Sequence, residues 1–146
     1  MEEIKKEHEV LFGKLMRKHN YEIHRICNKY GLYKGQHPIL KAIEAHPGLT
    51  QQELADEINA AKASITTSLN RMEKHGFVYR KRCKEDGRCN RIYITDAGVQ
   101  ASHACEKEIS EFKQVLFSKI DDDQLEILNG FLEKLIAGVE AYRENQ

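Results

Sequence analysis

Small, polar and cationic side chains follow one another between Lys62 and Arg71, in a segment whose apolar residues recur at helical spacing. Ile65, Leu69 and Met72 stand at positions i, i+4 and i+7, so one face of a helix is expected to be buried. The opposite face then offers side chains that can approach base edges in a major groove of DNA. We expect seven residues of this helix to bind DNA: Lys62, Ala63, Ser64, Thr66, Thr67, Asn70 and Arg71.

A cluster of cations follows this helix. Residues 71–91 hold eight basic and three acidic residues, an excess of five positive charges. Asp86-Gly87 is a strong hairpin dipeptide, and it lies between two segments with strand character, residues 77–82 and 91–94. A basic hairpin tip suits a minor groove. We expect DNA contacts from Lys84, Asp86, Arg88 and Arg91. Some of the other cations in this region are expected to form only a solvated face: Arg71, Lys74, Arg80, Lys81 and Arg82.

Two of the four cysteines, Cys83 and Cys89, flank the hairpin turn. Paired strands would place them opposite one another, near disulfide distance, so that oxidation would lock or distort the hairpin. The competing interpretation, which we favour, is two half-exposed thiols without a role. Cys27 is a further redox candidate, and its reactivity would require a lowered pKa.

A metal site is an alternative use of the histidines and cysteines, because zinc takes nitrogen and sulfur ligands. The candidate ligands share no tight spacing, apart from a histidine and a cysteine three residues apart, so we expect no metal and no cofactor. A resemblance to a known family, described below, implies the candidates, because some of its members sense zinc with side chains from the same regions: His24, Cys27, His37, His103 and Cys105. No nucleophile–base pair, glycine-rich phosphate loop or carboxylate pair stands out, so nothing supports an enzyme.

The residues around the helix that contains Ile65, Leu69 and Met72 predict where it ends and which elements it is connected to. Thr50 and Glu53 form a capping box, which starts a short helix before the turn at Asn59 and Ala60. Gly76 ends the second helix. Residues 50–76 therefore indicate a helix-turn-helix, and the hairpin behind it indicates a two-stranded β-wing.

Three long amphipathic helices are predicted outside this unit, at residues 3–30, 95–120 and 121–142. A shorter helix at 36–44 joins the helix-turn-helix core. Few apolar surfaces of the same chain are available to cover the apolar faces of the long helices. We therefore expect these helices to pack against a second copy of the chain. The fold class is mainly α, a winged helix-turn-helix with a two-stranded wing and N- and C-terminal dimerisation helices.

Length and composition allow one domain, residues 1–146, with no net charge and 40% hydrophobic residues. Residues 105–146 hold five basic and ten acidic residues, so the chain is electrically bipolar. No apolar run reaches the length of a membrane span, and the charged N-terminus does not resemble a signal peptide. We expect a cytoplasmic protein that does not bind membranes.

In element order the sequence resembles the MarR family of transcriptional regulators, which are winged helix-turn-helix homodimers. The similarity is most specific in residues 50–98, where the wing signature contains Asp86-Gly87-Arg88 and continues through residues 92–98. In the family the wing arginine enters the minor groove and the nearby aspartate orients it, which implies these roles for Arg88 and Asp86. One departure is Ala61, where the family usually has a small hydroxyl residue that opens the recognition helix.

This resemblance implies that residues 32–98 form the DNA-binding part and that residues 3–30 and 99–144 form dimerisation helices. The expected function is a repressor that binds double-stranded DNA at a pseudo-palindromic operator and is released by a small-molecule effector. Gating by thiol oxidation or by a metal, and a winged helix that docks proteins, remain alternatives. The expected effector pocket is lined by Tyr21, Tyr30, Tyr33 and His37.

Overall fold

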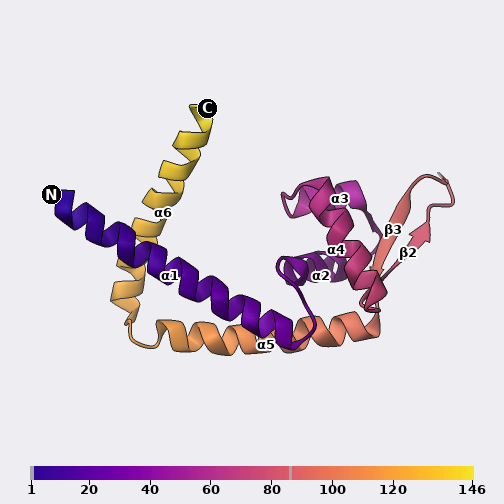
Figure 1. Cartoon of the computed structure of the whole chain (residues 1–146), viewed down its shortest axis with the longest axis horizontal. Coiled ribbons are helices and arrows are strands. Elements are labelled where there is room, and N and C mark those ends of the chain that lie inside the picture. The colour runs from indigo at the N-terminus through magenta and orange to yellow at the C-terminus, as the bar shows by residue number, and fades with distance from the viewer. Residues whose placement is uncertain (1, 86) are drawn as a thin grey trace. The chain divides into compact units, whose positions relative to one another are not determined.

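The computed structural model describes residues 2–85 and 87–146 (Figure 1). It contains two compact units, one that ends at Ile109 and one that runs from Ser110 to Gln146. The first unit holds α1 (Glu2–Lys29), α2 (Gln36–Ala45), β1 (Leu49–Thr50), α3 (Gln51–Glu57), α4 (Lys62–Lys74), β2 (Val78–Arg82), β3 (Asn90–Ile94) and most of α5 (Asp96–Phe117). The second holds the end of α5 and α6 (Asp122–Glu144). The prediction of a single domain stays a prediction.

Local capping explains where the helices of the helix-turn-helix begin and end. Thr50 accepts a hydrogen bond from the backbone N–H of Glu53, and the Glu53 carboxylate accepts one from the backbone N–H of Thr50, so the predicted capping box of α3 is confirmed. Asn59 turns the chain with a φ of 50°. Ala61 provides no side-chain cap for α4, so this helix starts without the hydroxyl group that usually satisfies its first amides.

The β-sheet has three strands rather than the two expected from the sequence. Its order is β1-β3-β2, with Leu49 opposite Ile92 and Thr50 opposite Arg91. β2 and β3 are antiparallel over five residue pairs, from Val78 opposite Ile94 to the end of the ladder at the wing tip. The β1 strand was not predicted, because two residues are too few to show the alternation of apolar and polar side chains that indicates a strand.

The apolar stripes of the short helices meet in one core within the first unit. Leu40, Ile43, Leu54, Leu69 and Met72 are completely buried. Val78 and Ile92 add the inner face of the sheet to this core. The predicted buried face of α4 is therefore confirmed, α2 and α3 contribute to the same core, and α4 leaves its opposite face in solvent.

The C-terminal end of α1 is fixed to α5 by polar and sulfur contacts. Lys29 Nζ and the Tyr30 hydroxyl both donate to Oε2 of Glu108, at 2.8 and 2.6 Å. The hydrogen bond from Lys29, followed by that from Tyr30, lowers the pKa of Glu108. Beneath them Cys105 Sγ lies 3.5 Å from Cys27 Sγ, and both side chains are buried.

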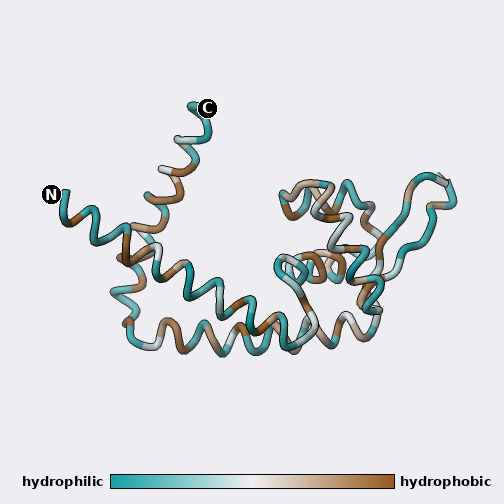
Figure 2. Tube along the Cα trace, viewed as in Figure 1, coloured by the Kyte–Doolittle hydropathy of each residue, from teal (hydrophilic) through white to brown (hydrophobic). Residues whose placement is uncertain are grey.

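The long helices expose hydrophobic side chains along much of their length, as the recurring brown segments in Figure 2 show. On α1 the exposed group consists of Ile4, Val10, Leu11, Phe12, Leu15 and Met16. α6 has no buried residue and exposes Ile127, Phe131, Leu132, Leu135, Ile136, Val139 and Tyr142. Its start is set by a capping box between Asp121 and Gln124. Among residues 2–85 and 87–146, no helix is long and apolar enough to cross a membrane.

Gly98, in the first turn of α5, is required by its packing rather than by its backbone angles. A Cβ atom here would lie 2.2 Å from the carbonyl oxygen of Phe77 and 2.7 Å from Cγ1 of Ile94. We expect Gly98→Ala to lower the free energy of unfolding by about 1–3 kcal/mol, because α5 must move away from the wing strands. Chemical denaturation measures this loss; Gly138→Ala, at a site with no atom within 4 Å of the new Cβ, is the control.

Candidate nucleic-acid interface

The outer face of α4 presents the residues that the sequence nominated for DNA contact. Lys62, Ala63, Ser64, Thr67 and Asn70 are exposed. Arg71 is exposed as well and its guanidinium lies 5.7 Å from the centre of the Tyr33 ring. The helix therefore offers one solvent-facing surface of small and polar side chains with cations at both ends.

The two threonines of this surface have their hydroxyl groups bound to the helix itself. Thr66 Oγ1 donates to the carbonyl of Lys62, and Thr67 Oγ1 donates to that of Ala63. Thr66 also accepts a 2.9 Å hydrogen bond from Nε2 of Gln51 on α3. Thr66 thus joins the two helices of the motif, and the exposed Thr67 is left with a methyl group and an acceptor to offer a base edge.

Arg80 reaches from β2 to the surface of α4. Its guanidinium forms an ion pair with Glu73 and donates a 3.0 Å hydrogen bond from Nη2 to Oδ1 of Asn70. The side chain is only 17% exposed. Arg80 is therefore a half-buried contact between wing and helix, and it does not belong to the solvated part of the group of cations.

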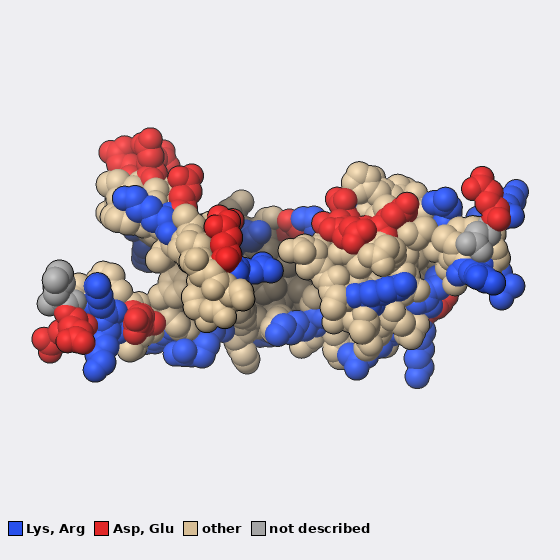
Figure 3. All heavy atoms as spheres, turned by 90° about the horizontal axis from the view of Figure 1, so that it is seen from above, with Lys and Arg blue, Asp and Glu red and all other residues tan. Residues whose placement is uncertain are grey.

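The wing places Lys84 and Arg88 in exposed positions near its tip, where blue side chains gather at the right-hand end of Figure 3. Asp86, expected to orient the arginine, lies outside the described residues. Arg91 is also exposed but its Nη1 donates to the carbonyl of Gly48, 2.9 Å away. This bond ties Arg91 to the loop before α3.

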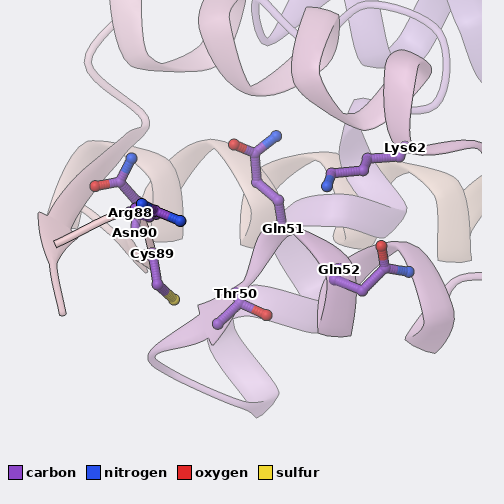
Figure 4. A pocket seen from close by; sticks show the side chains of 7 residues that line it. All are labelled: Thr50, Gln51, Gln52, Lys62, Arg88, Cys89 and Asn90. Carbon is purple, nitrogen blue, oxygen red and sulfur yellow. The ribbon is translucent and has the colours of Figure 1, made fainter. Parts of the chain in front are cut away.

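A hollow of about 250 Å³ lies where the wing, α3 and α4 meet (Figure 4). Lys62 from the start of α4 and Arg88 from the wing both line it, so cations from the two predicted DNA-binding elements border one depression. Its remaining lining is polar apart from one thiol: Thr50, Gln51, Gln52, Cys89 and Asn90. A surface of this composition suits phosphate and sugar contacts.

The four residues expected to line an effector pocket do not together line a hollow beside Tyr33. Two hollows lie there, and neither is lined by Tyr21, Tyr30 or His37. One hollow of about 320 Å³ is lined by Asn28, Gly31, Tyr33 and His75, and a second of about 390 Å³ by Tyr33, Arg71, Lys74 and His75. Tyr21 is 67% exposed on α1. Tyr30 binds Glu108, and His37 is buried beside Glu106.

The four cysteines lie in two close pairs, and two of the candidate histidines each lie beside a glutamate. Cys83 donates its backbone N–H to the carbonyl of Cys89, 2.9 Å away, so the two residues are opposite one another as predicted. Burial raises the pKa of Cys105, in contact with Cys27, to about 12. Of the alternative metal ligands, His37 lies near Glu106 and His103 near Glu44, and within residues 2–85 and 87–146 no three metal-binding side chains come together.

Sequence reasoning missed Gln51, Gln52 and Asn90 at this surface. Gln51 and Gln52 belong to the first turn of α3, where the capping box drew attention to Thr50 and Glu53. Asn90 lies at the first position of β3, opposite Arg82. They could have been found by assuming that the predicted hairpin packs against the segment that begins the helix-turn-helix.

Known proteins resemble the chain in both sequence and fold. A sequence model of the MarR family matches residues 32–90. A putative transcriptional regulatory protein for the hcr operon of Thauera aromatica is 29% identical over 110 residues, which cover 75% of this chain and 66% of that protein. A crystal structure of a MarR family transcription regulator covers 99% of this chain and 97% of its own, with a TM-score of 0.84 at 17% identity.

The Staphylococcus aureus MepR–DNA complex is similar with a TM-score of 0.75, at 21% identity over 90% of this chain and 97% of MepR. The wing signature, the winged helix fold and the family match over the helix-turn-helix agree with one another. Residues 32–90 match the MarR family, and the chain has the winged helix fold of MarR transcriptional regulators.

Proposed function

We propose that this protein represses transcription by binding a pseudo-palindromic DNA operator as a homodimer. The observation that supports this most directly is the surface shared by α4 and the wing, where Lys62 and Arg88 border one hollow. Contacts from α4 to base edges would provide sequence preference, and the wing cations would bind the backbone and the minor groove.

The apolar faces of α1 and α6 support the homodimer. Large hydrophobic side chains on both helices are more than 40% exposed, among them Leu11, Leu15, Phe131 and Leu135. Such faces mark protein interfaces when they are continuous. A twofold axis through these helices would present two α4 helices to DNA, which requires a separation of about 34 Å, one helical turn.

A small molecule releases the DNA in this proposal. To do so it must bind more tightly to a dimer whose two α4 helices are wrongly spaced than to the DNA-bound form. The hollows beside Tyr33 lie next to the C-terminal end of α4, because His75 lines both and Arg71 lines the larger one. They are therefore the first surfaces to test for an effector.

The proposal is tested by nuclease footprinting on the DNA upstream of the protein's own gene. We expect one protected region with two half-sites whose centres are about ten base pairs apart. Binding that is equal on the upstream fragment and on unrelated DNA of the same length would contradict a sequence-specific repressor. Binding to neither fragment would favour instead the alternative of a winged helix that docks proteins.

Thiol oxidation is a second candidate for gating, and the backbone hydrogen bond between Cys83 and Cys89, just beyond the ends of the paired strands, favours it. Both side chains are half-buried, and residues paired across antiparallel strands are about 5.5 Å apart at Cα, within the range of a disulfide. If the pair is a switch, we expect hydrogen peroxide to oxidise the two thiols to a disulfide, with reduction of peroxide to water, and to weaken DNA binding about tenfold. Dithiothreitol would restore it.

Affinity measured before and after peroxide treatment, together with Cys83→Ser/Cys89→Ser, checks this gating. The double variant should keep its affinity under peroxide. The matched control is Cys27→Ser/Cys105→Ser, because burial and the high pKa of Cys105 make that pair poorly reactive. Unchanged affinity of the oxidised wild type would leave the wing thiols without a regulatory role.

A further inference from the structure

The contact between Arg80 and Asn70 fixes one amide group on the DNA-facing side of α4. Arg80 donates from Nη2 to Oδ1 of Asn70 at 3.0 Å, while its other terminal nitrogen is held by Glu73. Asn70 and Glu73 are neighbours on α4, three residues apart. The Nε of Arg80 is buried and has no hydrogen-bond partner in the described parts of the chain. The two contacts with α4 therefore determine where this guanidinium lies.

Asn70 is well placed to meet DNA. Ala63, Thr67, Asn70 and Lys74 are spaced by four, three and four residues, so they form one stripe along α4. This stripe is opposite the buried residues Ile65, Leu69 and Met72, and all of its members are exposed. An α4 that enters a major groove would present this stripe to the base edges.

The Arg80 contact changes which bases Asn70 can read. An unrestrained asparagine recognises adenine with two bonds, because Nδ2 donates to N7 and Oδ1 accepts from the N6 amino group. Here Oδ1 already accepts a charge-assisted hydrogen bond from Arg80, which is stronger than a bond between neutral groups. Arg80 thus takes one of the two lone pairs of Oδ1, and its positive charge disfavours the approach of a second donor such as the adenine amino group. The two N–H donors of Nδ2 are then the groups that Asn70 offers to DNA.

We propose that Arg80 is a positioning residue that makes Asn70 a donor-only reader of the major groove. Donors match bases whose major-groove edge carries acceptors, which are O6 and N7 of guanine and O4 of thymine. Adenine can accept at N7, but its amino group meets no acceptor. Cytosine presents only an amino donor. The inference rests on the proposed function, since α4 must lie in the groove.

Selection of binding sites from a random DNA pool by the full-length protein tests the inference. The wild type should select one base pair at one position of each half-site, with guanine or thymine on the strand that Asn70 contacts, and Asn70→Ala should lose the preference at that position only. Asn70→Asp replaces the donors with an acceptor, so we expect cytosine to be preferred there by about tenfold over guanine.

Removal of the clamp should release the acceptor of Asn70. In Glu73→Ala/Arg80→Met, which removes both partner charges together, adenine should gain about tenfold at the Asn70-dependent position relative to wild type. Arg82→Met is the control, because Arg82 is an exposed cation on the same strand. It should weaken binding without changing any base preference.

Two results would overturn the inference: a preference unchanged in Asn70→Ala, or a folded clamp variant with wild-type preference. If the clamp variant does not fold, Asn70→Asp decides alone, since its side chain lies on the surface. A wild type that enriches no sequence at all would refute the proposed repressor itself, which is a different result.

Discussion

A chain that ends at Gln124 should fail to form a dimer and should not remain a stable, soluble monomer. The deletion removes residues 125–146, which include all the exposed hydrophobic side chains of α6. Their apolar partners on a second copy would then be open to water, and each uncovered leucine or phenylalanine costs about 1.5–3 kcal/mol. Sedimentation of the intact chain should give about twice the 16.9 kDa of one protomer.

Point variants separate the loss of an interface from the loss of a helix. Phe131→Ala/Leu135→Ala should weaken the dimer by about 3–6 kcal/mol per protomer, whereas Glu133→Ala/Lys134→Ala on the same turn of α6 should leave it intact. Circular dichroism reports the helix content of each variant. A truncated chain that is folded, soluble and monomeric at micromolar concentration would contradict an obligate dimer.

Arg88→Ala should weaken operator binding by about 1–3 kcal/mol for each wing, and hence by about 2–6 kcal/mol for a dimer with two wings. A guanidinium is weakly hydrated, stays charged and fits the narrow minor groove, where the negative potential is strongest. Arg88 is exposed beside the turn, so its removal should leave folding and dimerisation unchanged. Asp86→Ala should cost less, because it would remove orientation rather than the contact.

Operator affinity measured against salt concentration checks the role of Arg88. The slope of log affinity against log salt should fall by about one per protomer in Arg88→Ala, since one fewer counterion is released. Arg88→Lys keeps the charge and should restore the slope but not the full affinity. Superimposable curves for wild type and Arg88→Ala would remove the wing from the mechanism and leave α4 alone to explain binding.

The sequence predicted most helices because their signals are local. The capping boxes at Thr50 and Asp121 and the glycine at position 76 lie where the structure has helix ends. By contrast, β1 depends on pairing with a strand about forty residues away, and its two residues carry no period of their own. The missing cap at Ala61 was visible as a departure from the family pattern, and α4 indeed begins there without a side-chain bond.

The candidate site was predicted as a set of residue types and less well as a set of contacts. Exposure of Lys62, Thr67 and Asn70 followed from helical periodicity. Periodicity gives no information about partners on other elements, so the bond of Gln51 to Thr66 and that of Arg80 to Asn70 were not foreseen. For the same reason the buried contact of Cys27 with Cys105 could not be distinguished from two separate thiols.

Thr50 belongs at once to β1 and to the capping box of α3, and its strand partner is Arg91 on β3. The β3 strand also pairs with β2 along the wing, and Arg91 is bound to Gly48. The wing root and the start of the helix-turn-helix consequently share one hydrogen-bonded frame with no joint between them. We therefore expect a tilt of the wing root to move the start of α3 with it.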